Sequence, residues 1–162
     1  MNRKIIESFK IIDPLSLDDG VKYVQEIKYR VFPGDKICLY KTKTHYIFWT
    51  SYMDIFTKKR ECAQEEFPLN SLGWLIGQLE LGAQNKPLKV AAEPGDVSVD
   101  DIFSGESLVL SPSRHCCEEN NPGYTLRNYS RLDHITDIAP QSFQIPREAI
   151  ADQVLPALKR CL

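Results

Sequence analysis

The clearest hydrophobic pattern in the chain predicts an α-helix over residues 71–81. Its apolar positions recur at i, i+3, i+4 and i+7, and they are Leu72, Leu75, Ile76 and Leu79. This spacing places them along one stripe of a helix, which we expect to pack onto a core. Asn70 or Ser71 can cap the first turn, and Gly82 can end the last turn in a left-handed conformation.

Before this helix, apolar and polar residues alternate with a period of two, which is typical of half-buried strands. The stretches with this alternation or with many aromatic and β-branched residues are 3–12, 20–33, 37–40 and 45–52, with a further extension over 54–62. Pro33, Gly34 and Asp35 supply a turn between two of them. Together they predict an antiparallel meander.

After the helix, residues 84–101 contain proline and glycine and lack a clear period, so we expect a long surface loop. Short strands are predicted at residues 107–110, 123–129 and 142–145, with a turn-rich excursion over 114–122. The tail 146–162 has apolar residues at helical spacing. Pro156 lacks an amide N–H and should kink this helix or end it early.

These elements predict one α+β domain over residues 1–162. Its antiparallel sheet, open or partly closed, would be packed by a central helix and a C-terminal helix. No apolar run approaches the roughly 20 residues that span a bilayer, and Glu7 interrupts what would be the apolar core of a signal peptide. We therefore expect a cytoplasmic protein, and its five cysteines fit reduced thiols better than a disulfide framework.

Charge is spread unevenly along the chain. Residues 1–60 hold twelve Lys and Arg against seven Asp and Glu, whereas residues 61–162 hold eight against fifteen. The acidic bias is strongest over residues 90–113, which contain no basic residue. A block of one sign can steer an oppositely charged partner, and a solvated loop that keeps the protein soluble explains it equally well.

The sequence His115-Cys116-Cys117 is the main candidate for chemistry. As a metal site it lacks partners at a recognisable spacing, and adjacent side chains on an extended backbone diverge. As a thiol nucleophile, either cysteine would need His115 or His134 as its base. Half-buried structural thiols are the simpler interpretation, and we expect neither a metal nor a cofactor.

Nucleic-acid binding is a further alternative. Aromatic residues over 46–56 precede a basic run, Lys58, Lys59 and Arg60, and such surfaces can stack single-stranded bases. The net charge of −2 argues against this role. No glycine-rich phosphate loop is present: Gly73 and Gly77 lie within the predicted helix, where their spacing would permit close packing against a neighbour.

Three patches resemble a known class of proteins. They are Phe67-Pro68-Leu69 leading into Leu72-Gly73-Trp74-Leu75-Ile76 and Leu79-Glu80; Ser104-Gly105-Glu106-Ser107-Leu108; and Gly123-Tyr124 with Asn128 and Arg131. In this order they resemble small immunity proteins of bacterial contact-dependent growth inhibition systems, over roughly residues 60–160. The Gly-Gly pair that customarily follows the helix is absent here.

This resemblance implies a cytoplasmic binding protein without catalysis, which blocks a toxin domain, with a nuclease as the expected toxin. Acidic residues would then face the basic toxin surface: Glu93, Asp96, Asp100, Asp101, Glu106, Glu118 and Glu119. Two alternatives stay open. One is a small thiol hydrolase that uses Cys116 or Cys117 with His115 or His134, and the other is a non-catalytic regulatory subunit.

Overall fold

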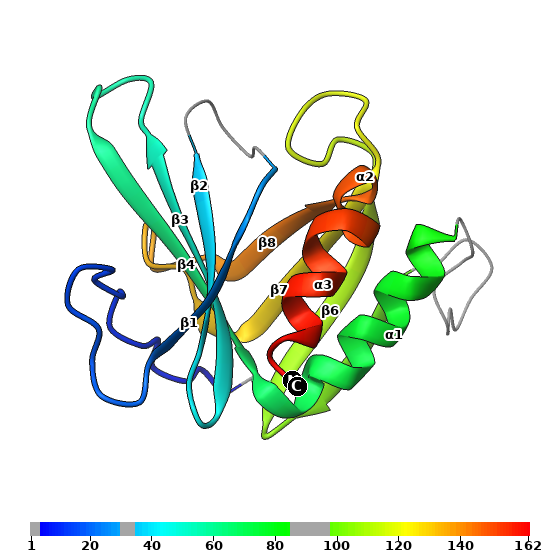
Figure 1. Cartoon of the computed structure of the whole chain (residues 1–162), viewed down its shortest axis with the longest axis horizontal. Coiled ribbons are helices and arrows are strands. Elements are labelled where there is room, and N and C mark those ends of the chain that lie inside the picture. Colours follow the sequence, from blue (N-terminus) through cyan, green and yellow to red (C-terminus); the bar gives the residue numbers. More distant parts are fainter. Residues whose placement is uncertain (1–3, 30–34, 85–97) are drawn as a thin grey trace.

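Two antiparallel four-stranded sheets and a set of helices form the fold, in a computed structural model that describes residues 4–29, 35–84 and 98–162 (Figure 1). Sheet A has the order β1-β2-β3-β4, with β1 Lys22–Ile27, β2 Lys36–Lys41, β3 His45–Met53 and β4 Arg60–Pro68. Sheet B has the order β5-β6-β7-β8, with β5 Val99–Phe103, β6 Glu106–Ser113, β7 Gly123–Leu132 and β8 Pro140–Pro146. Each sheet is a simple meander, and neither is closed.

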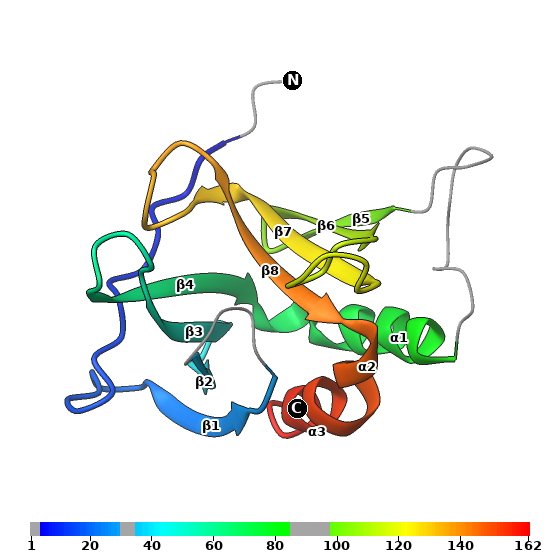
Figure 2. The ribbon, with the colours of Figure 1, turned by 90° about the horizontal axis from the view of Figure 1, so that it is seen from above.

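The helices lie between the two sheets. After β4, the short turn η1 (Leu69–Ser71) leads into α1 (Leu72–Ala83), and the chain ends with α2 (Arg147–Ala149), η2 (Ile150–Val154) and α3 (Leu155–Lys159). Seen from above in Figure 2, the sheets diverge from β4 and β8 like the sides of a wedge, and α1 and α3 occupy its open side. None of the helices in the described ranges is both long and apolar enough to cross a lipid bilayer.

One large hydrophobic core fills this wedge. Strand alternation sends Leu39 and Phe48 of sheet A and Leu108 and Leu126 of sheet B inward, where they meet the apolar side of the helices. The stripe predicted on α1 is confirmed, because all of its members are buried: Leu72, Leu75, Ile76 and Leu79. The α+β class predicted from the sequence is therefore correct.

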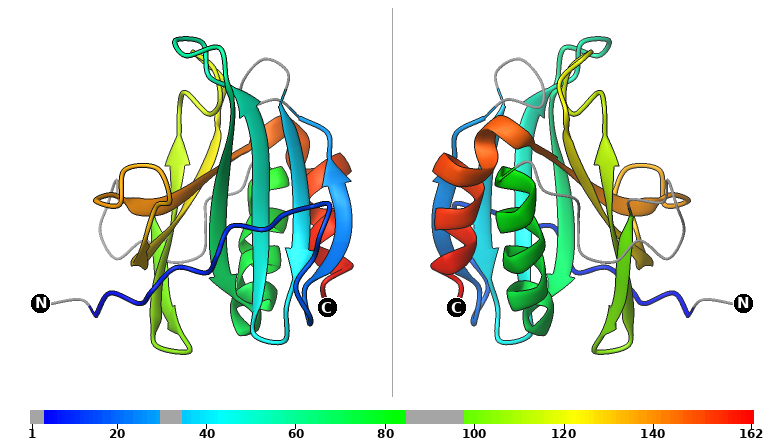
Figure 3. Two further views of the ribbon diagram at one scale, coloured as in Figure 1. Left: turned by 90° about the vertical axis from the view of Figure 1, so that its left-hand side faces the viewer. Right: turned by 90° about the vertical axis from the view of Figure 1, so that its right-hand side faces the viewer.

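Several predicted elements differ from the structure. Residues 4–13 form no strand; they run as an extended strap across the strands of sheet A, on the side away from the helices (Figure 3). The polar stretch from Arg60 to Pro68 is a strand, β4, and the end of the predicted acidic loop is the strand β5. Residues 33 and 34 of the predicted turn and most of that loop lie outside the described residues.

The C-terminal helical region passes Pro156 instead of ending there. Pro156 stands in the first turn of α3, where no N–H is needed, and the preceding segment η2 is a wider π-helical turn. This widening accommodates the proline, so that Leu155 and Leu158 still reach the core.

The helix glycines have roles that differ from those predicted. Gly82 does not end α1 in a left-handed conformation; a Cβ at this position would lie 2.6 Å from the hydroxyl of Tyr124. Gly73 and Gly77, by contrast, are exposed and would place a Cβ in open space. Gly82 is therefore the glycine through which α1 approaches sheet B.

Replacement of Gly82 by alanine should lower the free energy of unfolding by about 1–3 kcal/mol, because the methyl group overlaps the buried ring of Tyr124. Gly77→Ala is the matched control, and it should raise the free energy of unfolding by up to about 1 kcal/mol through helix propensity. Urea denaturation monitored by circular dichroism measures both. Equal effects of the two substitutions would contradict the close approach at Gly82.

Candidate functional site

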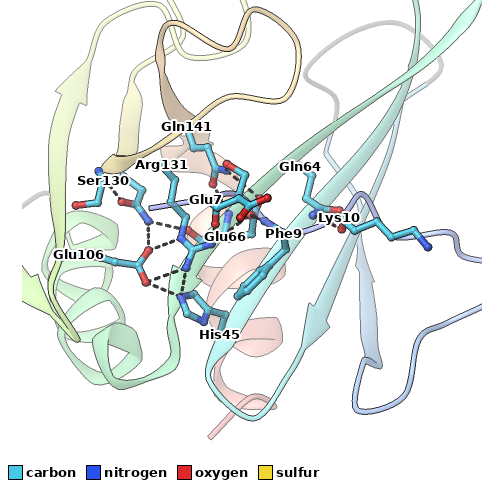
Figure 4. A network of polar contacts seen from close by, with 12 residues as sticks. Glu7, Phe9, Lys10, His45, Gln64, Glu66, Glu106, Ser130, Arg131 and Gln141 are labelled. Atoms are coloured by element: carbon cyan, nitrogen blue, oxygen red, sulfur yellow. Dashed lines mark hydrogen bonds and ion pairs between the residues drawn. The ribbon is translucent and has the colours of Figure 1, made fainter. Parts of the chain in front are cut away.

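A buried network of charged and polar side chains joins the two sheets where β4 meets β7 and β8 (Figure 4). We call this network the polar seam. Its side chains come from both sheets and are His45, Glu66, Glu106, Asn128, Arg131, His134 and Gln141. All except His134 are buried, and His134 is half-buried.

Glu66 is the central residue of the polar seam. It lies on β4, an edge strand of sheet A, and both of its outward-facing backbone groups bond to side-chain amides of sheet B. Its N–H donates to Gln141 Oε1 at 2.6 Å, and its carbonyl accepts from Asn128 Nδ2 at 2.9 Å. These amides take the place of a backbone ladder between the sheets.

The Glu66 carboxylate is also fully used, although the residue has no exposed surface. One oxygen accepts from the backbone N–H of Phe9 at 2.6 Å and lies 3.5 Å from Arg131 Nη1. The other accepts from His134 Nε2 at 2.8 Å and from Gln141 Nε2 at 2.9 Å. These four donors offset the cost of burying the carboxylate.

Glu106 is the second carboxylate of the polar seam, which corrects its assignment to the acidic surface. It starts β6 directly after Gly105, whose positive φ of 80° makes the turn from β5. Its oxygens accept hydrogen bonds from His45 Nε2 at 2.6 Å, from Asn128 Nδ2 at 2.8 Å and from Arg131. Burial alone would raise its pKa, but these bonds outweigh burial and lower the pKa to about 2.

The N-terminal strap covers the polar seam. Phe9 places its ring against two residues of the polar seam: Arg131 lies 4.4 Å above the ring centroid, and the His45 ring meets it edge-on at 4.8 Å. Arg131 Nη1 also donates to the carbonyl of Glu7 at 3.1 Å. Apart from one backbone bond, in which the N–H of Ile6 donates to the carbonyl of Ser130 on β7 at 2.7 Å, the strap is bound to the polar seam through side chains, and it forms no ladder with either sheet.

The exposed acidic residues lie elsewhere. Asp100 and Asp101 are exposed on β5, the edge strand of sheet B, and Glu118 and Glu119 are exposed on the loop between β6 and β7. Both groups belong to sheet B and its connections. Glu93 and Asp96 lie outside the described residues.

The structure separates the thiols from the histidine at position 134. Cys116 is buried beside Gly123, at the start of β7, whereas His134 follows the end of that strand. Ten residues of strand place these ends about 30 Å apart. A dyad of Cys116 or Cys117 with His134 is thus excluded by distance, and His134 is bound to Glu66.

In the sequence His115-Cys116-Cys117, the histidine accepts a hydrogen bond at Nδ1 from the backbone N–H of Asn120. Cys116 donates to the carbonyl of Tyr124, and its hydrogen bond with the neighbouring thiol raises the pKa of Cys117. Among the described residues no group of His, Cys, Asp and Glu side chains has the arrangement of a metal site. All five cysteines are free thiols.

Comparison with known proteins gives no relative: no protein-family model, curated protein or solved structure matches this chain. The polar seam was not predicted from the sequence, because its residues lie far apart along the chain. The one available signal was a cluster of polar residues, Gln64, Glu65 and Glu66, in a stretch that continues directly into apolar residues.

Arg131→Met should lower the free energy of unfolding by about 3–5 kcal/mol, because it leaves the carboxylates of Glu66 and Glu106 buried without their shared cation. The control is Lys159→Met, which breaks the exposed pair with Glu80 and should cost less than about 1 kcal/mol. Urea denaturation at pH 7 compares them. A loss below about 1 kcal/mol for Arg131→Met would contradict the proposed role of the polar seam.

Glu65, the neighbour of Glu66, should make the free energy of unfolding depend on pH. Burial raises its pKa well above the ordinary value, with Glu66 and Asp133 adding to the shift, so the native side chain keeps its proton while the unfolded chain loses it. The contribution of Glu65 to stability is complete below the pKa that it has in the unfolded chain. This contribution is lost as the pH rises toward the pKa that Glu65 has in the folded chain. In this window the free energy of unfolding should fall by about 1.4 kcal/mol per pH unit.

Glu65→Gln should remove this component, because an amide does not titrate. Denaturant titrations from pH 5 to pH 8 should therefore give a flatter stability profile for the variant than for the native chain. Asp54→Asn serves as the control, because that exposed carboxyl has a lowered pKa and should leave the profile above pH 5 unchanged. Parallel profiles for Glu65→Gln and the native chain would show that Glu65 is ionised when folded.

Proposed function

We propose that this chain is a cytoplasmic immunity protein that binds and neutralises a cognate toxin domain, with a nuclease as the expected toxin. The observation that carries the proposal is the exposed edge of sheet B. Asp100 and Asp101 stand exposed on β5, and the next residue, Ile102, keeps 68% of its surface exposed. An apolar side chain beside two carboxylates on an open sheet edge suits a protein interface better than a solvated loop.

Charge supports a basic partner. The segment around β5 has no basic residue over positions 90–113, and Glu118 and Glu119 extend the negative charge to the adjoining loop. Nucleases bind phosphate groups through lysine and arginine, so their substrate surface carries the complementary charge. Complementary potentials raise the association rate and discriminate between cognate and non-cognate partners.

The geometry of β5 favours contact through side chains. The backbone N–H of Ile102 donates to the carboxylate of Asp101 at 2.8 Å. A partner strand that extended sheet B at this edge would compete with this bond. We therefore expect the toxin to meet Asp100 and Ile102 through its own side chains and to be blocked sterically.

Replacement of Asp100 and Asp101 by asparagine should slow association with the toxin domain by about tenfold at low salt and weaken the salt dependence. The matched control is Asp18→Asn with Asp19→Asn, which removes the same charge from an exposed loop far along the chain. If the proposal is right, a toxin domain should be encoded next to this chain, and that domain is the partner to use. Stopped-flow measurements give the rates, and rescued growth on co-expression gives the biological readout.

Two results would count against the proposal in different ways. A stable complex whose association rate is unchanged in the β5 variant would place the interface elsewhere. Absence of both a complex and growth rescue would reject the function as an immunity protein.

A further inference from the structure

A groove of about 560 Å³ lies on the outer face of sheet A, on the side of the molecule opposite to the helices. Its volume is within the range of small-molecule sites. Aromatic rings of Tyr23, Tyr40 and Trp49 line it, together with the polar side chains of Lys36, Ser51 and Arg60. No residue of the polar seam or of the acidic edge of β5 contributes to it.

Strand register explains why these side chains share one face. Tyr23 of β1 stands opposite Tyr40 of β2, and their rings meet edge-on with centroids 5.7 Å apart. Lys36 of β2 stands opposite Ser51 of β3, two residues along from Trp49. Because side chains alternate along a strand, the groove has an aromatic part and an adjoining cationic part.

The indole of Trp49 is the unusual feature of this groove. The residue is 7% exposed, and its Nε1 is buried without a hydrogen-bond partner in the described parts of the chain. A buried N–H without an acceptor costs about 1–3 kcal/mol, so native proteins rarely keep one. Because Trp49 lines the groove, an acceptor brought by a ligand would satisfy this donor.

The charge of the groove indicates the charge of the ligand that would bind there. Lys36 and Arg60 line it, and no carboxylate is among the described residues that line it; Glu26, opposite Cys38 in the register of β1 and β2, lies beside it. Burial raises the pKa of Tyr40 to about 12 and also raises the pKa of Cys38, so neither side chain adds negative charge at neutral pH. An anionic group is therefore favoured next to the two cations.

We propose that this groove binds a small aromatic carboxylate, with its ring against Tyr23 and Tyr40 and its carboxylate oxygens taken by Lys36, Arg60 and the indole N–H of Trp49. The flat ring matches the aromatic part of the groove, and the carboxylate supplies both the charge and the missing acceptor. This site is independent of toxin binding at β5.

The test is a titration with 2-naphthoate, followed by ¹H–¹⁵N NMR of the tryptophan side chains. The chain has two tryptophans, and Trp74→Phe assigns the indole signal of Trp49. We expect this signal to move downfield on titration, as a hydrogen bond forms, while the signal of Trp74 stays in place. The neutral analogue 2-naphthamide should bind at least about tenfold more weakly, because it lacks the charge.

Variants locate the site. Lys36→Gln and Arg60→Gln should each weaken 2-naphthoate binding by about tenfold. Lys59→Gln is the matched control, since it removes the same charge next to Arg60 but outside the groove, and it should leave affinity unchanged. Trp49→Phe keeps a ring while removing the donor, and it should weaken binding by several fold; if this variant does not fold, the two charge variants decide.

Equal binding of 2-naphthoate and 2-naphthamide would overturn the proposal, because it would show an apolar surface without anion selectivity. Unchanged affinity in both charge variants would do the same. A Trp49 signal that moves with the toxin domain but not with 2-naphthoate would assign the groove to a protein side chain and reject the small-molecule site.

Discussion

The fold depends on one constraint: the two sheets meet at β4 without sharing a backbone ladder. Glu66 connects the sheets where they meet. The side-chain amides of Asn128 and Gln141 form hydrogen bonds with its backbone, and four donors surround its carboxylate. Arg131 then links Glu66 to Glu106, so that charge as well as hydrogen bonding holds the sheets together. Such buried networks are costly when incomplete, which makes the geometry of this junction specific.

The same constraint explains the N-terminal strap. Arg131 and the Glu66 carboxylate are removed from water only when Phe9 and the backbone of Glu7 lie over them. The strap continues across β4, where Gln64 exchanges hydrogen bonds with the backbone of Lys10 and Ile12. Its role is thus to complete the polar seam and to cover the outer face of sheet A.

The two sheets present different surfaces. Sheet B has the exposed carboxylates of β5 and the loop after β6, and these form the proposed toxin-binding surface. Sheet A has Lys36 and Arg60 beside an aromatic groove. The polar seam holds these surfaces in a fixed relation and uses its own charged groups internally, so Glu106 contributes to stability and not to the acidic surface.

Local sequence determined the elements whose side-chain pattern is set by burial of apolar groups: α1 with its leucine stripe, the aromatic strand β3, and the α+β class. Tertiary structure alone decided the polar elements. The stretch from Arg60 to Glu66 has too many polar residues for a recognisable strand, and its last three residues, Gln64, Glu65 and Glu66, are buried beside partners that lie up to 75 residues away. Hydrophobic periodicity indicates which face of a helix or strand is buried. It does not indicate which distant donor will form a hydrogen bond with a buried carboxylate. For this reason the helix was evident from the sequence, and the polar seam was not.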